Sequence, residues 1–162
     1  HTRLVSDWSS DVCSSDLVAQ LMDPSASGLP AFLVAGSGLH SGFMIAQVTA
    51  AALVSEMKTL SHPGVVDSIP TSANKEDHVS MATWSGRKAI MVAERCQQVL
   101  AIELLAAAQG IELRRPLKST PALEAIHRQV RAQVAPWDAD RVMATDIAAI
   151  APLLATGLLA SD

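Results

Sequence analysis

Ionisable side chains are concentrated in one polar segment, residues 71–81, which lies between two long apolar runs. The segment reads Thr-Ser-Ala-Asn-Lys-Glu-Asp-His-Val-Ser-Met, so two carboxylates stand between a lysine and a histidine. At least one of these carboxylates, Glu76 or Asp77, could present a fixed negative charge to a ligand. We therefore expect the functional residues of this chain to lie in this segment.

A helix is expected to begin inside the same segment. Pro70 ends the secondary-structure element that precedes it. Ser72 or Asn74 can then accept a hydrogen bond from the first N–H groups of a helix that runs on through Ala82. The two acids would then lie in the first helical turn, where the positive end of the helix dipole favours ionised carboxylates. The same spacing also fits a capping box, in which the acids only satisfy the helix end.

The composition predicts one soluble helical domain. The 162 residues can bury a substantial core, and with 17% charged residues and a net charge of −4 there is no basic surface for nucleic acid. Aromatic residues are few, so the core must consist of Ala, Leu, Val, Ile and Met, which suits closely packed helices. The charge-free stretch 24–55 is interrupted by Pro30 and several glycines, so no membrane span is expected.

The first 17 residues do not match the rest of the chain. Residues 6–17, SDWSSDVCSSDL, are rich in Ser and Asp, lack a helical or strand period, and resemble the translated read-through of a sequencing adapter. We exclude residues 1–17 from fold reasoning as a non-native leader, which makes Cys13 uninformative. The remaining cysteine, Cys96, is predicted to be buried and inert. Without a disulfide framework or a signal peptide, a reducing, cytoplasmic compartment is expected.

The period of apolar residues predicts an all-α fold over residues 18–162. Residues 18–22 are expected to form the end of a first helix. Further helices are expected near 43–60, 78–109, 122–134 and 141–159. Gly110 is expected to close the longest of them. Within that helix, residues 99–108 are apolar on all sides except at Glu103, so we expect other subunits to bury them.

The remaining polar patterns predict no second site. Side chains that could bind a metal are scattered: Glu76, Asp77, His40, His62 and His78. They lack His-x-x-x-His or Cys-x-x-Cys spacing, so no metal is predicted. Residues 85–88, Ser-Gly-Arg-Lys, lack the glycine loop and strand of a phosphate site, and Arg87 and Lys88 are predicted to form a solvated face. His127 is predicted to lie on the surface.

Six segments carry a specific resemblance: SGFMIAQVTAAAL at 41–53, KTL at 58–60, HP at 62–63, VDSIPTSAN at 66–74, EDHVSM at 76–81 and AIELLAAAQ at 101–109. Together they closely resemble the C-terminal part of the histidine ammonia-lyases, in the aromatic amino acid ammonia-lyase family. The resemblance covers about residues 23–133. It implies long antiparallel helices, a homotetramer with helices bundled at its centre, and elimination of ammonia from L-histidine to give urocanate.

The resemblance also implies a 4-methylidene-imidazol-5-one electrophile, formed autocatalytically from an internal Ala-Ser-Gly. The chain contains Ala26, Ser27 and Gly28, but Leu-Pro-Ala-Phe follows them where the cofactor tripeptide of the family is followed by Asp-Leu-Ala-Pro. We interpret this tripeptide as coincidental. The cofactor, and the Tyr, Asn and Arg groups used as base and carboxylate clamp, would lie in an absent N-terminal part. Residues 18–162 would be the last quarter to third of the enzyme, inactive alone.

Three residues carry the implied active site. Glu76 matches the glutamate that faces the substrate imidazole, and Met44 matches a methionine that lines the substrate pocket. Lys75 departs from the family, which most often has Gln there, and its ammonium could pair with Glu76 or point to solvent. An anionic acceptor suits imidazole, because its N–H groups are donors and a charged hydrogen bond is stronger than a neutral one.

Two other functions compete with this interpretation. One is a related phenylalanine or tyrosine ammonia-lyase or aminomutase, and the other is a helical interaction module without chemistry. The string Glu76-Asp77-His78 favours the histidine enzymes, because the phenylalanine lyases resemble Gln-Asp-Val at these positions.

Overall fold

The computed structural model describes residues 10–66 and 68–156. Among these residues there are helices and connecting loops but no strand, so the all-α prediction is confirmed. In chain order the elements are α1 (Ser10–Met22), α2 (Pro24–Ser27), the short 3-10 helix η1 (Ala31–Leu33), α3 (Met44–Leu60), the 3-10 helix η2 (Gly64–Val66), α4 (Ala82–Leu113), α5 (Pro121–Gln133) and α6 (Ala144–Thr156).

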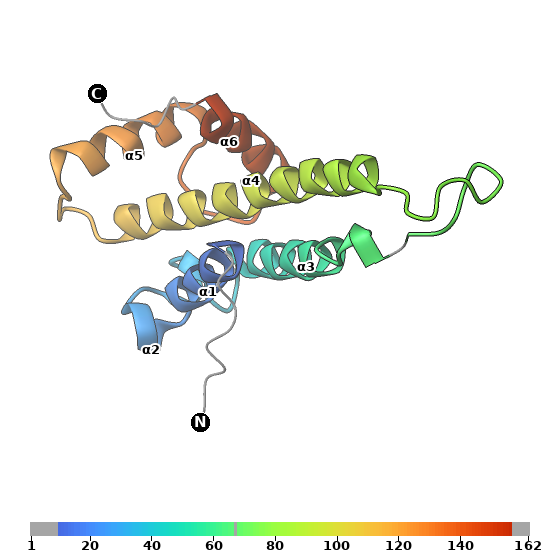
Figure 1. The fold of residues 1–162 in the computed structure, drawn as a ribbon. Helices are drawn as coiled ribbons and strands as arrows, with labels where there is room; N and C mark the ends of the chain where they lie inside the picture. The colour runs from blue at the N-terminus through green and yellow to red at the C-terminus, as the bar shows by residue number, and fades with distance from the viewer. Residues whose placement is uncertain (1–9, 67, 157–162) are drawn as a thin grey trace.

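The long helix α4 is the axis on which the other helices pack. Figure 1 shows α3 running beside α4 in the opposite direction, with α1 on the same side and α6 on the other. α5 returns along the C-terminal end of α4 after a loop. The two predicted long helices, 43–60 and 78–109, are therefore present as an antiparallel pair.

The C-terminal half of α4 supplies the centre of the core. Val99, Ile102 and Leu105 follow one another at three-residue intervals, which places their side chains near one face of the helix, and all three are buried. Burying one such side chain contributes about 1.5–3 kcal/mol. They pack in one cluster with Val18 of α1 and Ile150 of α6.

The chain itself covers most of residues 99–108, and their burial by other subunits stays a prediction. Every residue of this segment is buried or half-buried within the described chain, because α1, α3 and α6 together surround it. The exposed apolar side chains of α4 belong to its other end, where Trp84 is 46% and Ile90 63% exposed. The apolar period identified a largely covered helix segment but not the elements of the chain that cover it.

The ends of α4 also differ from the prediction. The helix begins at Ala82 rather than 78 and continues through Gly110 to Leu113. Gly110 lies inside the helix at a point of close packing. A Cβ atom there would lie 3.2 Å from Cδ1 of Leu29, so glycine allows the helix to approach Leu29 closely. The other predicted helices are found within three residues of their expected bounds where the structure describes them, and residues 157–159 lie outside the described residues.

The N-terminal helix extends further upstream than predicted. α1 begins at Ser10, so residues 10–17 are helical, and Ser14 is buried together with Val18. Residues 10–17, which the sequence analysis left out of fold reasoning, thus belong to a helix. Residues 1–9 of the predicted leader, Trp8 among them, lie outside the described residues, and the non-native origin of residues 1–17 stays a prediction.

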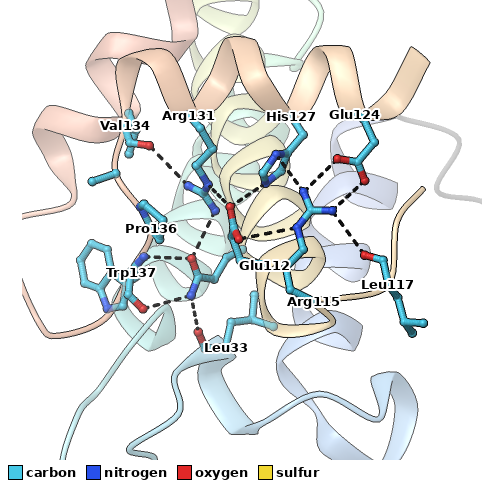
Figure 2. Close-up of polar contacts among 12 residues, drawn as sticks. Leu33, Glu112, Arg115, Leu117, Glu124, His127, Arg131, Val134, Pro136 and Trp137 are labelled. Carbon is cyan, nitrogen blue, oxygen red and sulfur yellow. Dashed lines mark hydrogen bonds and ion pairs between the residues drawn. The ribbon is translucent and has the colours of Figure 1, made fainter. Parts of the chain in front are cut away.

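Gln109 of α4 joins three segments through its side-chain amide. Its Nε2 donates to the carbonyl oxygens of Leu33 at 3.3 Å and Trp137 at 3.0 Å. Its Oε1 accepts from the backbone N–H of Trp137 at 2.9 Å and from Arg131 at 3.3 Å. Figure 2 shows Leu33, Trp137 and Arg131 converging on this point. Because Gln109 is 3% exposed, no solvent can replace these bonds.

A charged cluster holds α5 against the end of α4 (Figure 2). The Arg115 guanidinium makes two parallel hydrogen bonds to the Glu124 carboxylate, at 2.8 and 2.9 Å. Glu112 lies 3.1 Å from Nε2 of His127 and 3.4 Å from Nε of Arg131. The cluster pairs Glu124 of α5 with Arg115 in the turn after α4, and Glu112 of α4 with Arg131 and His127 of α5, which fixes how α5 lies on α4.

The prediction that His127 lies on the surface is wrong. Its side chain is 5% exposed, and Nη2 of Arg115 lies 3.4 Å from its Nδ1. A guanidinium has no acceptor, so Nδ1 must accept and the imidazole proton belongs on Nε2, which faces Glu112. His127 is therefore a structural residue of the cluster.

Replacing Gln109 with Leu should destabilise the fold strongly. The change leaves the N–H and C=O of Trp137 and the C=O of Leu33 buried without this partner, and each such group costs about 1–3 kcal/mol. We expect urea unfolding, followed by circular dichroism, to show a loss of several kcal/mol. Gln129→Leu, on the exposed face of α5, should change stability by about 0.5 kcal/mol or less. Equal effects of the two variants would contradict the role of Gln109.

Acid should weaken the contact between α4 and α5. The Arg115 hydrogen bonds, helped by the Ser119 N–H, lower the pKa of Glu124 from 4.5 to about 2. A carboxyl group whose pKa is lower in the folded chain adds stability above the unfolded value, and that stability is lost as pH falls toward the folded value. The Tm difference between wild type and Glu124→Gln should therefore shrink between about pH 5 and pH 2. Glu94→Gln, which removes an exposed carboxylate on α4, should show no such trend.

Candidate functional site

The predicted functional segment forms a loop between η2 and α4, and hydrogen bonds close the loop at two levels. At its base, Ser68 Oγ accepts from the Val79 N–H at 2.9 Å and lies 3.3 Å from the Val79 carbonyl. Near its tip, the Thr71 N–H donates to the Glu76 carbonyl at 3.0 Å, and the Glu76 N–H donates to the Thr71 carbonyl at 3.4 Å. Figure 1 shows this loop extending beyond the ends of α3 and α4.

Three consecutive residues at the tip have left-handed backbone conformations. The φ angles are 53° at Ser72, 55° at Ala73 and 64° at Asn74. This conformation costs about 1–2 kcal/mol for a residue with a Cβ atom, and such strain is found preferentially at functional sites. The backbone strain at the tip is therefore of the kind that is also found in binding loops.

This geometry contradicts the predicted helix start at residues 72–78. Glu76 and Asp77 do not lie in a first helical turn, because α4 begins at Ala82. The capping-box interpretation is wrong for the same reason. Asn and Ser favour helix caps and left-handed turns alike, so these residue types alone did not distinguish a helix start from the turn that is present.

The Glu76 carboxylate is oriented by its own loop. The Thr71 hydroxyl donates to Oε2 of Glu76 at 2.9 Å, which leaves Oε1 to accept from a ligand. Lys75, Asp77 and His78 are exposed on the same loop. The side chain singled out by the sequence therefore has one oxygen held in place and lies at the surface of this chain.

Met44 is the first residue of α3 and is 36% exposed. Glu76 lies in the loop between η2 and α4, which extends beyond the other end of α3 in Figure 1. A helix of 17 residues is about 25 Å long, so the described part of this chain does not bring Met44 and Glu76 together. Each of the two side chains can line a pocket only together with other segments.

The turn that leads to Met44 is tightly packed. Gly42 has a φ angle of +54°, and a Cβ atom there would lie 2.3 Å from the Phe32 carbonyl oxygen and 2.9 Å from Cγ1 of Val34. The Phe43 N–H donates to the same Phe32 oxygen at 2.9 Å. Only glycine fits this position.

The Ala-Ser-Gly tripeptide at 26–28 ends a short helix. Ala26 and Ser27 belong to α2, and Gly28 caps it with a φ angle of +67° while its N–H donates to the Pro24 carbonyl. The Ser27 hydroxyl lies 3.0 Å from the Asp23 carbonyl oxygen and accepts from the Leu29 N–H at 3.0 Å. The tripeptide therefore serves to end and cap the short helix α2.

Two of the hollows on the described surface lie at the two ends of α3, and neither Met44 nor Glu76 lines either of them. The first, about 470 Å³, lies between the start of α3 and the segment from Trp137 to Ile147. The second, about 580 Å³, lies between the C-terminal end of α3 and α4, where Lys88 and Cys96 line it.

Lys88 corrects another prediction. It is 7% exposed rather than solvated, its ammonium donates to the His62 carbonyl, and it lies 5.6 Å from the centre of the Trp84 ring. Arg87 is exposed as predicted. Cys96 is half-buried rather than fully buried. Through its hydrogen bond to the His62 carbonyl, Lys88 links α4 to the segment that follows α3.

Metal ligands do not gather in the described part of the chain: no three His, Cys, Asp or Glu side chains there could hold an ion together. Within the same residues, no helix combines the length and the apolar character needed to cross a membrane.

Comparison with known protein families shows the family to which this chain belongs. A sequence model described as "Aromatic amino acid lyase" matches residues 11–132. The chain belongs to the aromatic amino acid lyase family. The resemblance found in the sequence is thereby confirmed, and the matched range contains α1, α3, α4 and the loop that carries Glu76.

The similar proteins include histidine ammonia-lyases. That of Mus musculus is 61% identical over 137 residues, which is 85% of this chain and 21% of that protein. That of Burkholderia mallei is 58% identical over 134 residues, 83% of this chain and 26% of that protein. The chain therefore spans between a fifth and about a quarter of the curated relatives it matches.

Solved structures share the fold. The crystal structure of histidine ammonia-lyase from Trypanosoma cruzi has a TM-score of 0.88 and 51% identity, and the match covers 92% of this chain and 29% of that one. Tyrosine aminomutase from Streptomyces globisporus has a TM-score of 0.87 and 37% identity, with the same coverage. The fold is thus common to family members whose names give different reactions, and it does not select the substrate.

Gly42→Ala tests the turn that leads to Met44. The added methyl group clashes with the Phe32 carbonyl and the φ angle disfavours any side chain, so we expect a loss of more than about 1 kcal/mol of stability. Gly86→Ala is the matched control, because Gly86 lies in α4 with nothing within 4 Å of its added Cβ, and it should gain about 0.5–1 kcal/mol. Thermal unfolding of both variants measures the difference, and a neutral Gly42→Ala would contradict the packing.

Proposed function

We propose that this chain is the C-terminal part of a histidine ammonia-lyase, an enzyme that eliminates ammonia from L-histidine to give urocanate. The observation that carries the proposal is the 61% identity to the mouse histidine ammonia-lyase over 85% of this chain. Identity to the tyrosine aminomutase is 37%. The string Glu76-Asp77-His78 adds support, because it provides a carboxylate for an imidazole where the phenylalanine lyases resemble Gln-Asp-Val.

In this enzyme Glu76 would bind the substrate ring. The ring N–H of histidine is a donor, and Oε1 of Glu76 can accept it while Thr71 holds Oε2. A hydrogen bond to a charged acceptor is worth about 1.5–3 kcal/mol. Glu76 would also make the ring more basic by stabilising positive charge on it. Lys75, exposed beside Glu76, would adjust the affinity for histidine through its charge.

Met44 would line the substrate pocket from the other end of α3. Because Met44 and Glu76 are separated by the length of this helix, each would contribute to a pocket completed elsewhere. The absent N-terminal part of the enzyme and other subunits of the expected homotetramer are the segments that would complete it. The isolated chain is therefore expected to be inactive.

The N-terminal part would hold the family electrophile, 4-methylidene-imidazol-5-one, which would supply an electron-poor centre for the elimination. The Ala-Ser-Gly of this chain does not fit that group, because the N–H groups of Ser27 and Gly28 are held in helical hydrogen bonds to Asp23 and Pro24. We propose no cofactor role for Ala26, Ser27 or Gly28. What this chain supplies is substrate binding.

Glu76→Gln tests the proposal in a full-length enzyme made by joining residues 18–162 to the N-terminal part of a curated relative. Loss of the charged acceptor should lower kcat/KM for histidine about ten- to one-hundred-and-fifty-fold. Any activity toward phenylalanine should fall far less, because its ring has no N–H. Glu94→Gln, on the exposed face of α4, is the control. Equal losses for both substrates would show that Glu76 acts on folding rather than on the substrate.

A further inference from the structure

A carboxylate from the far end of the chain holds the turn that precedes Met44. Oδ2 of Asp140 accepts from the Ser41 N–H at 2.8 Å, and Oδ1 accepts from the Gly42 N–H at 2.9 Å. Asp140 lies between α5 and α6, beyond residue 132, where the family match ends. Each carboxylate oxygen thus has its own backbone donor, 98 or 99 residues away in sequence.

The segment that carries Asp140 is braced on its own side. The Arg141 guanidinium lies 4.4 Å from the centre of the Trp137 ring, donates to the carbonyl oxygens of Ala135 and Pro136, and pairs with Asp146 at 2.9 Å. The Trp137 backbone is bonded to Gln109 of α4. Asp140 therefore reaches the turn from a support fixed on both α4 and α6.

The turn is held from its other side as well. The Phe43 N–H donates to the Phe32 carbonyl at 2.9 Å, and the Phe43 ring packs on Trp137 with 5.6 Å between ring centres. The Met44 N–H then donates to the Ser41 carbonyl at 3.1 Å as α3 begins. With Asp140 on one side and Phe32 on the other, Ser41 and Gly42 have one conformation, and that conformation sets the direction in which Met44 leaves the turn.

We propose that Asp140 is a positioning residue for the substrate pocket: its bidentate contact with the Ser41 and Gly42 N–H groups fixes the turn that places Met44 against the substrate. The inference rests on the proposed function for the role of Met44. The same two N–H groups lower the pKa of Asp140, so the contact persists through the neutral range. Asparagine cannot replace it, because its amide NH₂ would face a backbone donor.

The test uses the full-length enzyme described above, with three variants. Asp140→Asn should lower kcat/KM for histidine about 10- to 100-fold, because a misplacement of about 1 Å can cost that much. The loss should come mainly from KM, since Met44 binds rather than reacts. Asp140→Glu keeps the charge and should recover part of the loss. Asp138→Asn, an exposed carboxylate of the same segment, should resemble wild type.

Amide hydrogen exchange separates this inference from the proposed function. In Asp140→Asn the amides of Ser41 and Gly42 should exchange faster, while those of the α4 core keep their protection. Unchanged exchange at these two amides, or unchanged kcat/KM together with faster exchange, would overturn the positioning role, as would a loss seen in kcat alone. An inactive wild-type enzyme would instead refute the proposed function, and the exchange result would still decide whether Asp140 holds the turn.

Discussion

Buried backbone polar groups must be paired, and the Gln109 amide meets that requirement for two irregular segments at once. Leu33, the last residue of η1 with a φ angle of +55°, and Trp137, in the loop after α5, are both buried. The Leu33 N–H donates to the Pro30 carbonyl, but the Leu33 carbonyl and both backbone groups of Trp137 pair with a side chain that donates and accepts in one plane. Gln109 is that side chain, and its place on α4 lets both segments approach the helix.

A chain of contacts leads from this amide to the surface. Gln109 fixes the Trp137 backbone, Arg141 stacks on the Trp137 ring, and Asp140 beside it holds Ser41 and Gly42. The core therefore determines the start of α3 through polar contacts rather than through apolar packing alone. Hydrogen bonds require a narrow range of distances and angles. These contacts therefore restrict the relative placement of the joined segments more than contacts between aliphatic side chains would.

The sequence predicted the parts of the structure that local pattern controls. The apolar period located α3 and α4 and the all-α class, and the segments at 41–53 and 76–81 identified the family. It failed where a partner comes from a distant segment. His127 and Lys88 looked solvated because their partners, Glu112, Arg115 and the His62 carbonyl, belong to other elements. Asp140 had no signal at all, because its role depends on residues 98 and 99 positions away.

The separation of Met44 and Glu76 follows from the rigidity of α3. A continuous helix fixes the distance between its ends, and the Ser68–Val79 bonds together with the start of α4 at Ala82 confine the loop that carries Glu76. Small loop motions cannot bring the Glu76 carboxylate to Met44 across about 25 Å. On the proposed function, one chain therefore contributes Met44 to one pocket and Glu76 to another. On the same proposal, helix length would make the chemistry depend on assembly, because this segment alone would complete neither pocket.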